Sequence, residues 1–154
     1  MGKRYLAITY VLLTLLVIKD GAAFAQCSPH KIAKSFKPNL SPYKYDSYAY
    51  NEVTFGDKPQ TLEVIFTALA DLKYKLVFGT SMFDENVQVN IYDKGMRARN
   101  RKKLYNNNNG VDNLFWSVEL DKPGIYYIDY EVPAKGTSQS DNGCMVLLIG
   151  FQQE

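Results

Sequence analysis

Residues 93–112, with the sequence DKGMRARNRKKLYNNNNGVD, contain the densest run of charge in the chain. Six basic side chains fall between positions 94 and 103, with no acidic residue among them. Closely spaced cations can attract an anionic glycan, a lipopolysaccharide phosphate or an acidic protein, and such attraction weakens as salt rises. The competing interpretation is a long solvated turn between two strands.

Catalytic chemistry has few candidate residues. His30 is the only histidine, so a Ser-His-Asp or Cys-His arrangement would have to use it. Cys27 lies three residues earlier, but such a pair on an N-terminal arm has no orienting group and no oxyanion hole. Asp84 and Glu85 are adjacent on one loop, unlike glycosidase carboxylates, which face each other across the substrate. The sequence therefore predicts a protein that is not an enzyme.

Metal chemistry is poorly supported as well. Asp84, Glu85 and Asn86 supply hard oxygen ligands on one loop, but the ligand spacing of a calcium-binding loop is absent. One histidine and two distant cysteines cannot form a four-ligand zinc site. We expect neither a metal nor a cofactor.

The N-terminus has the pattern of a secretory signal peptide, with a basic start, an apolar run over 5–18 and a small-x-small cleavage site at 23–25. The run is shorter than the roughly 20 residues of a membrane-spanning helix. Lipid attachment is disfavoured because Gln26, which is not a small residue, precedes Cys27. We therefore expect cleavage of residues 1–25 and export to the periplasm or the medium.

Removal of this leader changes the charge balance. The full chain has 18 basic and 16 acidic side chains, and the leader carries three and one of them, which leaves 15 of each. Because the segment 94–103 carries +6, the rest of the mature chain carries −6. This balance and the predicted export argue against nucleic acid as a partner.

The mature chain keeps two cysteines, Cys27 and Cys144, near its opposite ends. In an oxidising compartment an even pair favours a disulfide. Closing so long a loop is credited with about 4–5 kcal/mol by the chain-entropy model. Two free thiols, one of them buried in the last strand, are the alternative, and the spacing alone leaves both open.

Alternating apolar and polar residues predict strands along most of the mature chain. The segments are 43–55, 61–69, 74–80, 87–93, 113–120, 125–132 and 144–151. The last segment is apolar in both phases, as in a central strand that is covered on both faces. About seven strands separated by short turns, without a long amphipathic helix, predict an all-β antiparallel sandwich, with a closed barrel as the alternative.

The chain is expected to form one domain after the leader. Residues 26–42 are an N-terminal arm, where Ser28 as N-cap and Pro29 at the first helical position indicate one short helix. Residues 43–154 form the sandwich. A bulge near Asp46 would place the four tyrosines of the first strand on one side.

The order of these elements resembles the jelly-roll sandwich of the bacterial pre-peptidase C-terminal domain. The segments that carry the resemblance are YKLVF, VQVNIYD and FWSVELDKPGIYYIDYEV, and PGIYYIDYEV is similar to that family's Gly-x-Tyr-aromatic strand. The resemblance covers about residues 60–150. It implies a jelly-roll-like sandwich of about seven to eight strands and a non-catalytic accessory or binding module, and it carries over no site residues.

Tyr92, Phe115 and Tyr127 are out of phase with the core residues of their strands. Three exposed aromatic side chains on one sheet face would form a platform for sugar or protein. The alternative is that they lie beneath the N-terminal arm or a second sheet.

The basic segment also has two interpretations. Every second residue from Arg97 to Arg101 is an arginine, which predicts an exposed edge strand with NNNNG as its turn and with charges that hinder aggregation. The functional interpretation is a cationic rim beside the aromatic platform. The rim consists of Arg97, Arg99, Arg101, Lys102 and Lys103.

Together these features predict an exported, non-catalytic β-sandwich that binds a glycan or a cell-envelope protein. Peripheral contact with an anionic envelope surface is a further expectation. The alternative is a structural subunit of a cell-envelope complex that uses the same apolar surface as a permanent interface. The sequence leaves the oligomeric state open.

Overall fold

The computed structural model describes residues 27–79, 87–107, 115–135 and 142–153. The helices in this part of the chain are α2 (Pro29–Phe36) and the 3-10 helix η1 (Lys37–Leu40). Its strands are β1 (Lys44–Thr54), β2 (Gln60–Ala68), β3 (Leu72–Gly79), β4 (Gln88–Tyr92), β5 (Lys103–Asn106), β6 (Phe115–Leu120), β7 (Gly124–Val132) and β8 (Asn142–Gln153). The predicted leader and the candidate calcium ligands Asp84, Glu85 and Asn86 lie outside the described residues.

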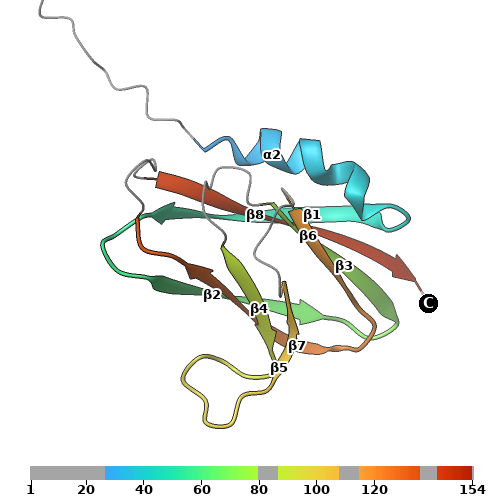
Figure 1. Cartoon of the computed structure of the whole chain (residues 1–154). Coiled ribbons are helices and arrows are strands. Elements are labelled where there is room, and N and C mark those ends of the chain that lie inside the picture. Colours follow the sequence, from blue (N-terminus) through green and yellow to red (C-terminus); the bar gives the residue numbers. More distant parts are fainter. Residues whose placement is uncertain (1–26, 80–86, 108–114, 136–141, 154) are drawn as a thin grey trace, which may run out of the picture.

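The strands form two four-stranded antiparallel sheets. Sheet A has the order β1-β8-β3-β6, and sheet B has the order β2-β7-β4-β5. Figure 1 shows the two layers facing each other, with α2 on the outer side of sheet A. Strands that alternate between two sheets in this order make a jelly roll. The predicted antiparallel sandwich is confirmed, and the closed barrel is wrong.

The core lies between the sheets and is built from one phase of each strand. Its most deeply buried members, at 1% exposure or less, include Leu76, Phe78, Val89, Ile91, Ile128, Tyr130 and Met145. The ring of Phe78 stacks on Trp116 at a centroid distance of 5.2 Å and meets Tyr130 edge-on at 6.1 Å. Because every second side chain of a strand is buried, apolar and polar residues alternate in the sequence and the strands can be recognised from it.

Helix α2 covers the outer face of sheet A. Ala33, Phe36 and Leu40 pack against the outward side chains of β3 and β8, which are Val77, Cys144, Val146 and Leu148. This second apolar layer is the reason why β8 is apolar in both phases. Gly79 allows the close approach, since a Cβ at that position would collide with the Phe36 ring.

A disulfide between Cys27 and Cys144 fixes the start of α2 to β8. The two Cα atoms lie 5.8 Å apart although the residues are separated by 117 positions. The predicted bridge is therefore present, and the alternative of two free thiols is wrong.

Strand β1 contains the predicted bulge. Its register with β8 shifts between Tyr45 and Ser47. As a result Tyr45, Tyr48 and Tyr50 lie opposite alternate residues of β8, on the side where α2 packs. Without the extra residue Tyr45 would face the core.

The predicted edge strand in the basic segment is wrong. Residues 93–102 form a loop, and the edge strand β5 begins only at Lys103. Asn100 has a φ of 57°, a left-handed conformation that interrupts an extended strand. None of the helices in the described ranges is long and apolar enough to cross a membrane.

Removal of the disulfide should destabilise the fold. The Cys27→Ala/Cys144→Ala variant is expected to lose about 2–5 kcal/mol of unfolding free energy, because the bridge closes nearly the whole domain and holds α2 on sheet A. Urea unfolding followed by tyrosine and tryptophan fluorescence measures the loss. A reduced wild type should behave like the variant, and equal stability of oxidised wild type and variant would contradict the expectation.

Candidate functional site

The outer face of sheet B carries three rows of side chains that cross the sheet. In the order β2, β7, β4, the rows are Thr61–Glu131–Gln88, Glu63–Asp129–Asn90 and Ile65–Tyr127–Tyr92. The alternate residues of the same strands belong to the core, so these nine point outward. Three of them are acidic, which gives this face a concentrated negative charge.

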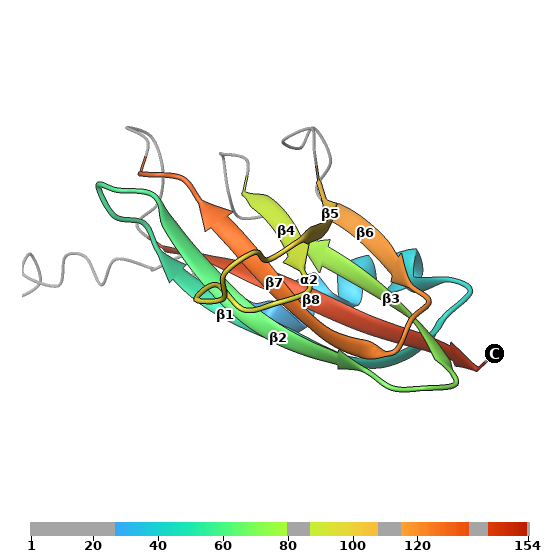
Figure 2. The same ribbon diagram turned by 90° about the horizontal axis from the view of Figure 1, so that it is seen from below.

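The loop of residues 93–102, here called the cationic loop, folds back over this face. The Met96 amide donates a hydrogen bond to the Glu63 carboxylate on β2. Gly95 lies against the Tyr127 ring on β7, where a Cβ would be 3.2 Å from a ring carbon. Figure 2 shows the loop lying across β7 and β2. Gly95 and Met96 therefore hold the loop against the sheet, while Figure 1 shows the rest of the loop projecting from the outer face of sheet B.

Arg101 is the main attachment point of the cationic loop. Its Nη2 atom lies 2.8 Å from Oδ2 of Asp129 in an ion pair. The guanidinium also lies over the Tyr92 ring at 3.5 Å from the centroid. The Arg101 and Asp129 side chains are only 18% and 5% exposed. The expectation that Arg101 points to water is wrong, because the buried Asp129 carboxylate binds it.

The base of the cationic loop is closed by Asp93. The Asp93 carboxylate accepts a hydrogen bond from the Lys102 amide at 2.7 Å, and the Asp93 amide donates to the Lys102 carbonyl at 3.1 Å. A further turn inside the loop joins the Ala98 amide to the Gly95 carbonyl at 2.9 Å. These contacts give the loop a defined backbone course.

Burial raises the pKa of the Asp129 carboxyl group. Arg101 lowers the pKa through its hydrogen bond and charge, while Glu63 and Glu131 raise it further. Within the described residues Asp129 Oδ1 and Arg101 Nε have no hydrogen-bond partner, so the ion pair is monodentate. The charged form of Asp129 is therefore costly in the folded state, in spite of its cation.

Asn107, part of the asparagine tract, has a structural role that the sequence did not reveal. Its side-chain oxygen accepts a hydrogen bond from the Val89 amide at 2.7 Å, and its side-chain nitrogen donates to the Val87 carbonyl at 3.2 Å. The side chain is buried beside β4. It substitutes for a strand partner where β5 ends. The turn predicted for NNNNG falls largely on residues 108–110, which lie outside the described residues.

The structure separates the predicted aromatic platform. Tyr92 and Tyr127 are paired across β4 and β7 and are half-buried beneath the cationic loop. Phe115 lies on sheet A, where its ring packs against that of Phe36 on α2 with 5.9 Å between the ring centroids. The expectation of one shared face is wrong for Phe115, because β6 pairs with β3 and turns its outward side chains toward α2.

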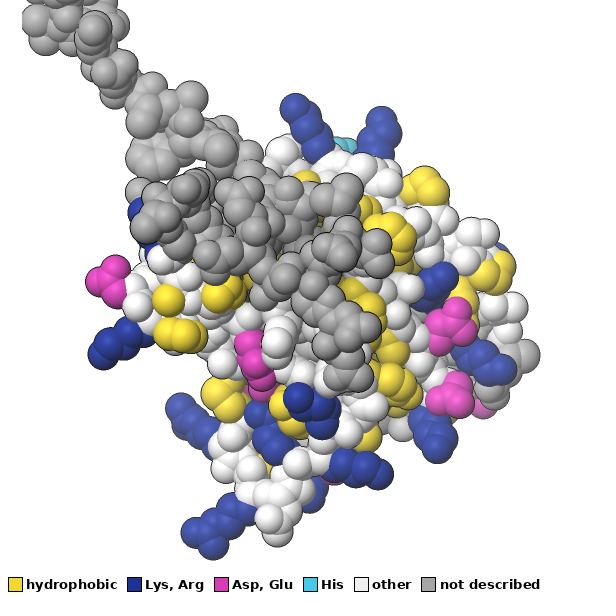
Figure 3. Space-filling model, in the orientation of Figure 1, with side chains coloured by type: hydrophobic (Ala, Val, Ile, Leu, Met, Phe, Trp, Pro, Cys, Tyr) yellow, Lys and Arg dark blue, Asp and Glu magenta, His cyan; other side chains and the backbone are white. Residues whose placement is uncertain are grey.

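The remaining members of the predicted cationic rim stay in solvent. Arg97, Arg99, Lys102 and Lys103 are exposed, as are Lys94 and Met96 in the same segment. Figure 3 shows lysine and arginine side chains gathered around the loop at the bottom of the view. The cationic loop thus has one half-buried cation, Arg101, that anchors it and several exposed cations around it.

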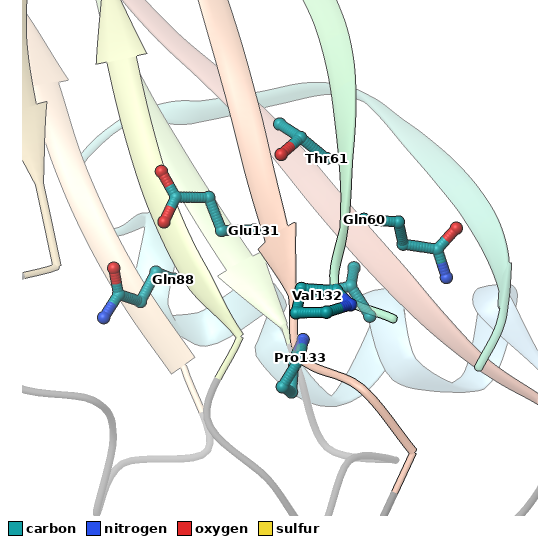
Figure 4. Close-up of a pocket in the computed structure, with 7 residues that line it drawn as sticks. Gln60, Thr61, Gln88, Glu131, Val132 and Pro133 are labelled. Carbon is teal, nitrogen blue, oxygen red and sulfur yellow. The ribbon is translucent and has the colours of Figure 1, made fainter. Parts of the chain in front are cut away.

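The first row of the outer face lines a shallow pocket of about 310 Å³ at the end of sheet B. Figure 4 shows Glu131, Gln88 and Thr61 side by side on one face, with Pro133 and Val132 at the strand end. The Glu131 carboxylate accepts a hydrogen bond from the side-chain nitrogen Nδ2 of Asn90 at 2.7 Å. These polar residues come together through strand register, for which the sequence has no local signal.

The structure also tests the candidate catalytic pair. Cys27 is bonded to Cys144, so it cannot act as a thiolate nucleophile beside His30. His30 is exposed on α2, with its ring 6.4 Å from that of Tyr48. In the described ranges no three histidine, cysteine or acidic side chains are grouped as metal ligands.

Comparisons with known proteins add little to this geometry. No family model matches the chain, and no curated protein matches it. Among solved structures the chain is similar to PliG of Aeromonas hydrophila, a periplasmic inhibitor of g-type lysozyme. The identity is 17%, the match covers 68% of this chain and 86% of that chain, and the TM-score is 0.44. The resemblance to the pre-peptidase C-terminal domain stays a prediction.

Loss of the Arg101 guanidinium should destabilise the protein. Arg101→Gln leaves the buried Asp129 carboxylate without its cation, and we expect a loss of about 2 kcal/mol in unfolding free energy. Arg99→Gln, an exposed change in the same loop, should stay within about 0.5 kcal/mol of the wild type. Urea unfolding of Arg101→Gln, Asp129→Asn and the double variant gives the coupling energy. Additive losses would show that the pair does not interact.

The raised pKa of Asp129 should make stability depend on pH. The folded state keeps the proton at pH values where the unfolded chain has released it, so this contribution is fully present below about pH 4 and is lost as pH rises through the folded pKa. The unfolding free energy of the wild type should therefore fall relative to that of Asp129→Asn as pH rises. Urea unfolding of both proteins across this range measures the difference, and a constant difference would refute the raised pKa.

Proposed function

We propose that the chain is an exported, non-catalytic binding module that holds an acidic protein of the cell envelope through the cationic loop. The observation that carries the proposal is that one cation of the loop binds the sheet while the other cations are exposed to solvent. Arg101 is half-buried and bound to Asp129, while Arg97, Arg99 and Lys102 project into solvent from the same short segment. The first feature fixes the loop on the sheet, and the second leaves its other cations free to meet a partner.

Anchoring favours binding because it reduces the cost of ordering the loop. The cationic loop is attached at Glu63, at Asp129 and through the Asp93–Lys102 hydrogen bonds. A loop whose backbone is already fixed loses less conformational entropy when a partner binds. Its exposed cations then meet a partner in one arrangement, which gives selectivity as well as attraction.

The composition of the exposed loop favours a protein as the partner. Met96 is 44% exposed among the arginines. Arginine and methionine are enriched in protein interfaces. The partner surface would be acidic around a small apolar contact, with the apolar contact received by Met96.

Export is supported by the disulfide and by the predicted leader. Disulfides form and persist in oxidising compartments such as the bacterial periplasm. The Cys27–Cys144 bridge joins the ends of the folded domain and leaves no free cysteine in the part of the chain that the structure describes. These two features support a periplasmic or secreted protein.

A structural subunit is the second candidate, and one observation favours it. Ile65 and Ile125 are 60% and 54% exposed on the adjacent strands β2 and β7, beside the cationic loop. An apolar contact of this kind would suit a permanent interface in an envelope complex. In that case the association would resist salt, whereas binding through the cationic loop would not.

The proposal is tested by cross-linking the purified protein to a solubilised envelope fraction and identifying its partners by mass spectrometry. The variant Arg97→Gln/Arg99→Gln/Lys102→Gln should lose about tenfold or more in affinity for a partner that the wild type binds. A matched control removes three exposed cations elsewhere, with Lys31→Gln/Lys44→Gln/Lys58→Gln. This control should bind the partner like the wild type.

The outcomes separate the candidates. A partner with an acidic surface that is lost in the loop variant and at high salt supports the proposal. A partner that both variants retain at high salt, and that an Ile65→Ser/Ile125→Ser variant loses, indicates the structural subunit. Binding of acidic glycans that the loop variant loses, with no protein partner, would assign the cationic loop to glycan recognition and overturn the proposal.

A further inference from the structure

A groove lies on the opposite side of the molecule, between α2 and β1. It has a volume of about 340 Å³, and its lining consists of His30, Ala33, Lys34, Lys37, Tyr45 and Tyr48. It is separate from the cationic loop because α2 covers sheet A and the loop covers sheet B. Its chemistry is therefore independent of the proposed function.

The walls of the groove are fixed by features of the fold. The Cys27–Cys144 disulfide holds the start of α2, and Phe36 is buried against sheet A at its end. The β1 bulge brings Tyr45 to the same side as Tyr48. A ligand would therefore meet a preformed site, which reduces the cost of binding.

The lining combines cations with aromatic rings. The cations are Lys34 on α2 and Lys37 at the start of η1, and His30 of α2 lies beside them. Among the described residues that line the groove none is acidic. The Lys37 ammonium lies over one face of the Tyr45 ring, 4.3 Å from the ring centroid, in a cation–π contact. Lysine ammonium groups bind phosphate and carboxylate as point charges. Tyrosine rings offer a flat apolar face with a polar hydroxyl group.

Size limits the ligand to a small one. Pockets for small molecules have volumes of about 300–1,000 Å³, and this groove is at the lower end of that range. A flat ring with apolar faces and one anionic group would satisfy both the tyrosines and the lysines. Sugar rings that carry a carboxylate or a phosphate have this combination.

We propose that the groove between α2 and β1 binds one anionic sugar unit. Lys34 and Lys37 hold the carboxylate or phosphate, Tyr45 and Tyr48 pack against the ring, and His30 donates a hydrogen bond. Such a unit could be a free sugar acid, a sugar phosphate or a terminal residue of an envelope glycan, since all three share the recognised chemistry.

The test is a titration of the purified protein, followed by NMR chemical shifts, with glucuronate, glucose 1-phosphate, glucose and inorganic phosphate at millimolar concentrations. We expect glucuronate or glucose 1-phosphate to shift the signals of Tyr45 and Tyr48. Glucose should bind at least about tenfold more weakly, because it lacks the charge that the lysines hold. Tighter binding of glucuronate would indicate a sugar carboxylate as the ligand, and tighter binding of glucose 1-phosphate would indicate a sugar phosphate.

Variants of the lysines on α2 and at the start of η1 provide the test and its control. Lys34→Gln/Lys37→Gln should lose about tenfold or more in affinity for the anionic sugar, because both cations that hold the acid are removed. Lys31→Gln changes an exposed lysine on the same helix that does not line the groove, and it should bind like the wild type. Unchanged signals outside the groove verify that each variant is folded.

Three results would overturn this proposal. They are an absence of shifts at Tyr45 and Tyr48, equal binding of inorganic phosphate and the sugar acids, and equal binding by the Lys34→Gln/Lys37→Gln variant. The cationic-loop variant Arg97→Gln/Arg99→Gln/Lys102→Gln should keep its affinity for the sugar acid. A negative result for sugar binding at the groove therefore does not affect the proposal for the cationic loop. A negative result for the cationic loop likewise does not affect the proposal for the groove.

Discussion

The Arg101 guanidinium lies between the Tyr92 ring and the Asp129 carboxylate, and the course of the loop between β4 and β5 follows from that position. Asp129 is in the middle of sheet B with Glu63 and Glu131 on neighbouring positions, where a buried negative charge is costly. A cation delivered by the loop offsets this cost. The other cations of the loop therefore extend into solvent from a backbone that is fixed on sheet B.

The two outer faces of the sandwich are covered in different ways. The apolar outer face of sheet A is covered by α2, which the Cys27–Cys144 disulfide holds in place. The acidic outer face of sheet B is covered by a loop that an ion pair and backbone hydrogen bonds hold. The first cover creates a groove with lysines and tyrosines, and the second creates an exposed cationic loop. Both surfaces suit anionic partners, although they differ in the size of partner that they can accept.

Much of the fold could be predicted because alternation reports burial directly. The strand at 61–69 shows this, and so does the apolar β8, which is covered on both faces. Contacts that depend on strand order could not be predicted, because the alternation of apolar and polar residues identifies a strand but not the sheet to which it belongs. Phe115 was therefore placed on the wrong face. Arg101 was assigned to solvent because its partner Asp129 is 28 positions away and meets it only through register and loop course.

Hydrogen exchange of the Met96 and Lys102 amides tests the central claim most directly. These amides donate to the Glu63 and Asp93 carboxylates in the anchored loop. We expect both amides to be protected in the wild type and Arg101→Gln to remove this protection, while the amides of β7 and β8 stay protected. Rapid exchange of both amides in the wild type, or unchanged protection in Arg101→Gln, would contradict the anchoring of the cationic loop by Arg101.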